Sequence, residues 1–265
     1  MSQGYDLYLP RDSWLHRLDP RAKLWAVLLA GTIALVYKQI AVLACLLVLA
    51  QLALLSARIP PGRIRWLWGR LAPLLAMILV LQPLFLPGPG PDLFTLGPVR
   101  LTVFGLLEGL SFALRAATLA FVAATLLLTT EPTNLVRGLT KLGLPYSWGL
   151  TVGLAIRYLP TTYSLYVTIN EAQQARGWIV GRGNLIERAR SYLPTLVATI
   201  IAALRLSDGL ALALAARGLG YPAQRTVLHD IHMRRADWLA VALAALLSAG
   251  LLVLRYGIGF GAGAW

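Results

Sequence analysis

The chain has 265 residues, of which 58% are hydrophobic and only 13% charged, and its mean hydropathy is +0.68. Soluble domains carry about 25% charged residues and could not bury so much apolar surface, so the composition excludes a soluble protein and indicates lipid as the solvent. The formal net charge is +13, but the basic residues are spread between apolar stretches and form no runs interleaved with aromatics, which argues against nucleic acid as a partner.

Metal and disulfide chemistry are not favoured either. The single cysteine, Cys45, lies inside an apolar run, so it cannot form an intrachain disulfide or a cysteine metal site. Three histidines are a poor basis for a metal centre. We therefore expect no metal site and no other cofactor.

Apolar runs in chain order predict five membrane-spanning helices and an all-α, polytopic membrane fold. Lys38 and Gln39 separate the first two runs and predict a tight hairpin, and the Pro/Gly segment 87–91 predicts the next turn. The predicted spans are residues 24–37, 40–57, 71–86, 101–130 and 238–256.

The Lys and Arg residues predict the orientation of these spans in the cell membrane. With the N-terminus inside, 20 of the 24 basic residues fall on the cytoplasmic side, three fall outside, and Arg115 lies within a span. This bias follows the positive-inside rule. We therefore expect a cytoplasmic N-terminus and an external C-terminus.

Residues 131–235 are the ambiguous part of the chain. Segments 146–168 and 193–204 are apolar enough to resemble spans. A span at 146–168, however, would place four arginines outside, against the charge bias: Arg176, Arg182, Arg188 and Arg190. We therefore predict three regions: a membrane region with four spans (1–130), a cytoplasmic domain of long helices (131–235) and a C-terminal span (236–265).

Within this central region the chain nearly repeats itself. One segment opens at Pro160 and ends in Ala175-Arg176-Gly177, and another opens at Pro194 and ends in Ala216-Arg217-Gly218. Proline fits the first turn of a helix and glycine fits the position just past its end, so the pattern predicts two complete helices with arginines at equivalent tips. A single tripeptide of this kind is typical of an ordinary helix cap, whereas two matched copies favour paired docking points for carboxylates of a partner.

Two pairs of charged side chains are further candidates for a functional role. Arg205 and Asp208 are three residues apart and are expected to pair across one helical turn. Glu108 and Arg115 share one helical face near the outer boundary, where we expect them to reach the interface or to screen each other.

These motifs resemble the T component of energy-coupling factor (ECF) transporters. The resemblance extends over most of the chain and is carried by residues 15–23, 129–133, 157–160, 171–177 and 216–218. The chain departs from the family pattern at Leu214 and Ala215, where an acidic residue often precedes the second tripeptide.

The resemblance implies a division of labour among several subunits. Two ABC-type ATPases would receive Arg176 and Arg217, with Ala175, Gly177, Ala216 and Gly218 shaping the two tips. Pro160, Pro194, Glu171, Arg205 and Asp208 would support the two helices. A small membrane protein, the S component, would bind a vitamin or a transition-metal ion.

The residues themselves agree that ATP chemistry belongs to a partner. No Gly-x-x-x-x-Gly-Lys-[Ser/Thr] phosphate loop occurs in the chain. The alternatives are a membrane-embedded enzyme, which would need clustered catalytic groups, and a self-sufficient secondary transporter, which would favour inverted repeats at mid-membrane. The sequence supports neither alternative, so we expect the chain not to be an enzyme.

Overall fold

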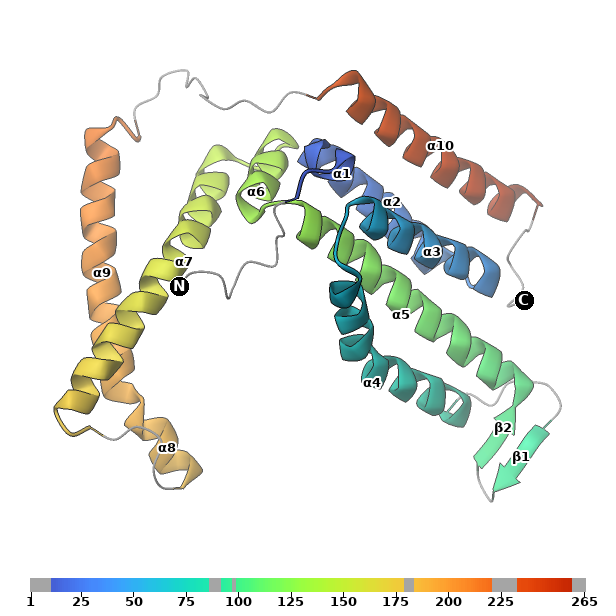
Figure 1. The fold of residues 1–265 in the computed structure, drawn as a ribbon, viewed down its shortest axis with the longest axis horizontal. Coiled ribbons are helices and arrows are strands. Elements are labelled where there is room, and N and C mark those ends of the chain that lie inside the picture. The colour runs from blue at the N-terminus through green and yellow to red at the C-terminus, as the bar shows by residue number, and fades with distance from the viewer. Residues whose placement is uncertain (1–10, 86–91, 97–98, 179–183, 221–232, 259–265) are drawn as a thin grey trace. The chain divides into compact units, whose positions relative to one another are not determined.

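The computed structural model describes residues 11–85, 92–96, 99–178, 184–220 and 233–258. It confirms the all-α membrane fold (Figure 1). The predicted turn at 87–91 lies outside the described residues. The helices are α1 (Trp14–Arg17), α2 (Pro20–Val36), α3 (Ile40–Ser56), α4 (Pro61–Phe85), α5 (Val103–Thr129), α6 (Pro132–Lys141), α7 (Tyr146–Ala175), α8 (Leu185–Ser191), α9 (Leu193–Ala216) and α10 (Arg235–Ile258).

The chain divides into two compact units. The first unit contains Gln3–Leu144 and Ile231–Trp265, so the C-terminal helix α10 belongs with the N-terminal helices. The second unit is Pro145–Asp230.

In the first unit α5 is the central helix. It packs against α2, α3 and α4, while α10 packs against α2 (Figure 1). Phe121 of α5 is fully buried, and its ring lies 5.0 Å from that of Trp68 on α4. At Gly109, a Cβ atom would lie 3.3 Å from Cδ of Pro83, so glycine permits the close approach of α5 to α4.

Among the described residues, four helical stretches are long and apolar enough to cross a membrane: Pro61–Phe85, Val103–Thr129, Ala189–Ala216 and Arg235–Arg255. Three of them overlap spans predicted from the sequence. The other one contains α9, which the charge bias assigns to the cytoplasmic face. Helices α2 and α3 have 17 residues each and are about 26 Å long, slightly shorter than a hydrocarbon core of about 30 Å.

A short antiparallel hairpin, formed by β1 (Asp92–Leu96) and β2 (Val99–Thr102), precedes α5. The sequence analysis did not predict it and assigned residues 101 and 102 to the fourth span. Thr102 instead ends the second strand and caps α5, because its hydroxyl accepts a hydrogen bond from N–H of Gly105 at 3.1 Å.

The second unit corrects one predicted helix boundary. Pro160 does not open a helix but lies inside α7, which begins at Tyr146 directly after Pro145. An internal proline removes one backbone hydrogen bond, at a cost of about 3 kcal/mol, yet the helix continues on both sides of it. Pro194 does lie in the first turn of α9, as predicted.

Helix α9 packs against α7 and against the short helix α8. The chain reverses between α7 and α9, so the C-terminal ends of these two helices lie at opposite ends of the pair (Figure 1). Since α9 has 24 residues and is therefore about 36 Å long, the two helix tips are widely separated.

Candidate functional site

Arg176 is the C-cap residue of α7 and directly follows Ala175, the last residue of the helix. Its φ and ψ are −83° and 9°, and Gly177 follows with φ of +83°. Two hydrogen bonds close the helix end, from N–H of Gly177 to the carbonyl of Gln174 at 2.9 Å and from N–H of Trp178 to the carbonyl of Gln173 at 3.0 Å. This pair of bonds around a left-handed glycine is the Schellman motif.

Arg217 ends α9 in the same way. Its φ and ψ are −89° and 10°, and Gly218 follows with φ of +79°. N–H of Gly218 donates to the carbonyl of Ala215 at 2.9 Å, and N–H of Leu219 donates to that of Leu214 at 2.9 Å. The two Ala-Arg-Gly tripeptides are therefore conformational copies of each other.

Both arginine side chains are exposed. Neither forms an ion pair with any residue in the described part of the chain. The helix geometry therefore presents two guanidinium groups that remain available to acceptors on another molecule.

Trp178 stabilises the end of α7 next to Arg176. The sequence analysis does not predict this role. Its indole Nε1 donates to the carbonyl of Ser191 at 2.8 Å and so connects the end of α7 to the end of α8, just before α9 begins. A tryptophan directly after the Ala-Arg-Gly tripeptide was the available signal, but its partner 13 residues away could not be inferred from spacing.

The other predicted support residues differ in their placement. Glu171, Arg205 and Asp208 are all exposed. Within the described residues no ion pair joins Arg205 to Asp208, so the predicted pairing across one turn is not formed.

Helix α9 carries an exposed apolar stripe. Its large side chains recur at intervals of three and four residues, which places them on one face of the helix. The stripe consists of Leu193, Leu196, Val197, Ile200, Ile201 and Leu204, which are 47–59% exposed. Contiguous apolar surface of this kind marks contact with lipid or with a protein partner.

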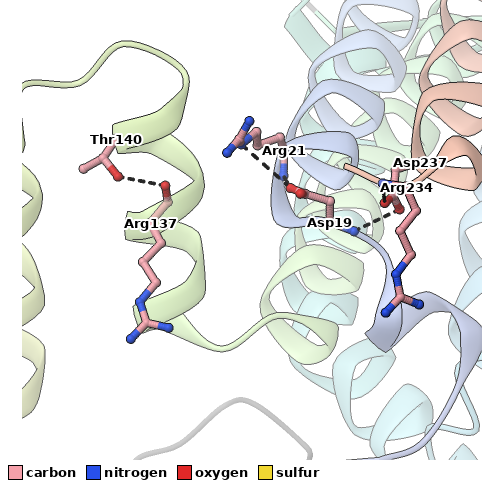
Figure 2. Close-up of polar contacts among 6 residues, drawn as sticks. All are labelled: Asp19, Arg21, Arg137, Thr140, Arg234 and Asp237. Atoms are coloured by element: carbon pink, nitrogen blue, oxygen red, sulfur yellow. Dashed lines mark hydrogen bonds and ion pairs between the residues drawn. The ribbon is translucent and has the colours of Figure 1, made fainter. Parts of the chain in front are cut away.

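In the first unit, a buried polar cluster joins the beginnings of α2 and α10. The Asp237 carboxylate accepts hydrogen bonds from N–H of Asp19 at 3.1 Å and from N–H of Arg234 at 2.8 Å (Figure 2). Asp19 in turn caps its own helix by accepting from N–H of Arg21 at 2.9 Å. This cluster therefore fixes two helix beginnings that are more than 200 residues apart in the sequence.

Lys23 belongs to the same cluster and lies just before the apolar run at 24–37. Its Nζ donates to the carbonyl of Thr129 at 2.9 Å and to the hydroxyl of Thr130 at 3.1 Å. Burial lowers the pKa of Lys23 from 10.5 to about 8, and the nearby carboxylates of Asp19 and Asp237 oppose that shift. Lys23 therefore remains mostly charged at neutral pH.

At the opposite end of the first unit, polar groups of α5 hold the connection between α2 and α3. Ser111 Oγ donates to the carbonyl of Lys38 at 2.6 Å, and Arg115 Nη2 donates to that of Tyr37 at 2.9 Å. Glu108 pairs with Lys38 at 3.7 Å. Of the two alternatives expected for Glu108 and Arg115, mutual screening is wrong, because each has its partner in the α2–α3 connection.

These features define a class of protein. Several helices are long and apolar enough to cross a membrane, and two matched, exposed arginine tips stand on a separate helical unit. In the described residues no group of three or more His, Cys, Asp or Glu could hold a metal ion. The chain is a multi-pass membrane protein with a second unit suited to contact with other molecules.

Comparison with known proteins gives the family. Residues 11–227 match the family model CbiQ, described as cobalt transport protein. The chain is also similar to proteins named energy-coupling factor transporter transmembrane protein EcfT. The one from Streptococcus equi is 32% identical over 260 residues, covering 94% of this chain and 95% of the relative. The one from Listeria innocua is 31% identical over 259 residues, covering 94% and 96%. The chain belongs to this CbiQ/EcfT family of ECF transporter transmembrane components.

Proposed function

We propose that this chain couples ATP hydrolysis by two ABC-type ATPases to the movement of a small substrate-binding membrane protein, the S component. The observation that carries the proposal is the pair of exposed arginines, Arg176 and Arg217, on helix ends of identical conformation. Two matching helix ends suit binding to two similar surface grooves, one on each subunit of an ATPase pair.

Arginine suits this role because its planar guanidinium forms forked hydrogen bonds with carboxylates. Helices α7 and α9 hold the two tips at opposite ends of one packed pair, so each arginine engages a different subunit. Rotation of one ATPase against the other would then act on the whole helix pair.

The apolar stripe on α9 supports the second partner in the proposal. The Leu, Ile and Val side chains of this stripe are exposed within the second unit. We therefore expect another apolar surface to bury them. A small membrane protein supplies an apolar surface that could cover the stripe and move with the helix pair. The substrate would be a vitamin or a transition-metal ion held by that protein, and this chain itself would hydrolyse no ATP.

The proposal includes the orientation of the chain in the cell membrane. Region 1–130 and region 236–265 would cross the bilayer, whereas 131–235 would lie at the cytoplasmic face with the N-terminus on the same side. Arg176 and Arg217 must be cytoplasmic for the ATPases to reach them. Single cysteines introduced at exposed positions of α7 should therefore resist impermeant thiol reagents in intact cells, and labelling from outside would contradict this orientation.

The decisive experiment replaces both arginines with alanine in the complete transporter. Removing one member of a desolvated charge pair costs about 3–5 kcal/mol, because its partner is left without a counter-charge. The double variant should therefore insert normally but lose nearly all ATPase co-purification and vesicle uptake. Either single variant should lose part of both, and lysine should restore only part because it lacks the forked geometry.

Arg190→Ala is the matched control, because Arg190 is an exposed arginine of the same unit on α8. It should leave both readouts unchanged. Wild-type uptake by the double alanine variant would show that Arg176 and Arg217 are helix caps and nothing more.

A further inference from the structure

Two adjoining pockets of different polarity lie in the first unit. An apolar groove of about 340 Å³ runs along α2, α3 and α5, and a polar pocket of about 260 Å³ lies at the beginnings of α2 and α10. The linings of the two pockets share Leu18, Lys23 and Thr129, so the pockets adjoin at these residues, with an apolar end on one side and a polar end on the other.

The groove is lined mainly by alanine and leucine. Small side chains such as Ala22, Ala26 and Ala30 recur every four residues along α2 and leave room beside the helix. Trp14, which is 60% exposed, borders the groove close to Lys23, where an interfacial tryptophan is expected. The apolar end therefore lies in the lipid zone and the polar end at the headgroup zone.

The polar pocket contains both signs of charge in equal number. Its basic residues are Arg17, Lys23 and Arg234, and its acidic residues are Asp19, Glu131 and Asp237. A ligand with only negative charge would meet three carboxylates, and one with only positive charge would meet three cations.

One carboxylate oxygen in this pocket has no hydrogen-bond partner among the described residues. Asp19 is only 4% exposed, and its Oδ2 atom is buried without any hydrogen-bond partner among the described residues. A buried carboxylate oxygen with no donor costs free energy, so a donor that enters the pocket would be stabilised there. Arg17 and Arg234 are exposed and form no ion pair within the described part of the chain.

We infer that this site binds a zwitterionic phospholipid with a primary ammonium headgroup, such as phosphatidylethanolamine. One acyl chain occupies the groove, the phosphate lies against Arg17 and Arg234, and the ammonium donates to Asp19. A choline headgroup has no N–H to donate to the carboxylate. Free phosphate would leave the groove empty.

Native mass spectrometry of the purified chain tests the inference with three lipids of identical acyl chains. Dioleoyl phosphatidylethanolamine should be retained about tenfold more strongly than the phosphatidylcholine or phosphatidylglycerol forms, the effect of one charge-assisted hydrogen bond. Asp19→Asn keeps a helix-capping oxygen and should abolish the preference for ethanolamine over choline. Ala26→Phe fills the groove from an exposed position and should reduce retention of all three lipids.

A second pair of variants keeps the test valid if Asp19→Asn does not fold. Glu131→Gln changes an exposed carboxylate at the pocket and should weaken the ethanolamine preference, whereas Glu187→Gln on α8 should not. Equal retention of ethanolamine and choline lipids, or preference for phosphatidylglycerol, would overturn the inference. It would also fail if Ala26→Phe spared lipid binding but released a co-purified membrane protein, because the groove would then be a protein contact.

Discussion

The two units of the chain differ in how much of their own surface they bury. In the first unit large side chains such as Tyr37, Leu43 and Phe121 are fully buried against neighbouring helices. In the described part of the second unit, only Gly149 and Thr195 are buried, and large apolar residues of α7 and α9 remain exposed. The first unit therefore has a core of its own, whereas the described part of the second leaves most of its large apolar side chains exposed.

The polar contacts differ in the same direction. Asp237 and Lys23 bond to groups 218 and 106 residues away, respectively, and so connect helices of the first unit that are distant in sequence. In the second unit the hydroxyls of Thr151 and Thr162 donate to carbonyls of their own helix four residues earlier. Thr125 and Thr129 of the first unit make the same local bonds, so what distinguishes the first unit is its additional bonds between distant parts of the chain.

The largest expected difference between the units comes from matched aspartate substitutions. Asp237→Ala leaves the buried N–H of Asp19 without an acceptor and removes a counter-charge from Lys23, so unfolding should become easier by about 3–5 kcal/mol. Asp208→Ala on the exposed face of α9 should change stability by less than about 0.5 kcal/mol.

Unfolding in mixed detergent micelles, followed by tryptophan fluorescence, measures both variants. Similar losses at the two positions would contradict the contrast between a unit with a buried core and one with little buried surface. Asp237→Asn keeps one acceptor oxygen and should fall between the wild type and the alanine variant.

A smaller effect is expected from pH, and it should be confined to the first unit. Burial lowers the pKa of Lys23 to about 8 in the folded chain, whereas the unfolded value is 10.5. The unfolded state therefore binds more protons above pH 8, and the free energy of unfolding should rise by about 2 kcal/mol from pH 7 to 9.5. Lys23→Met should lack this rise, and a fall in stability specific to the wild type would contradict the prediction.

Local sequence signals predicted the helices and their ends well. Long apolar runs indicated α3, α4, α5 and α10, because hydrophobic length is a direct requirement of a bilayer. Glycines after Arg176 and Arg217 indicated the helix ends correctly, because the left-handed backbone there depends on a single residue type.

One local signal predicts the wrong helix start. Proline favours first turns, so Pro160 predicts the beginning of a helix, but the apolar residues before it continue α7 back to Tyr146.

Contacts between residues far apart in the sequence are not predicted. The bond between Asp19 and Asp237 could not be inferred, since no local pattern connects positions so far apart. Sequence patterns therefore predict the two arginine-tipped helix ends but not the polar cluster that joins the beginnings of α2 and α10.

The smallest predicted effect concerns the backbone of the two tips. Gly218 lies just past the end of α9 with φ of +79°, whereas Gly209 lies inside α9, and a Cβ atom at either position would meet nothing within 4 Å. Gly218→Ala should destabilise the end of α9 by roughly 1–2 kcal/mol, because an L-residue is strained at that φ. Gly209→Ala should instead stabilise α9 by roughly 0.5–1 kcal/mol, because alanine loses less backbone entropy in a helix.

Gly177→Ala and Gly153→Ala repeat this comparison on α7, with Gly177 at φ of +83° and Gly153 inside the helix. Amide hydrogen exchange in the last helical turn should become faster in both tip variants and slower or unchanged in both interior variants. If the two helix ends bind the ATPases, the tip variants should also weaken ATPase co-purification. A changed backbone conformation at the glycine would point the neighbouring guanidinium away from its ATPase groove. Faster exchange at the tips with full ATPase binding would mean that the glycines shape the helix end without directing Arg176 or Arg217.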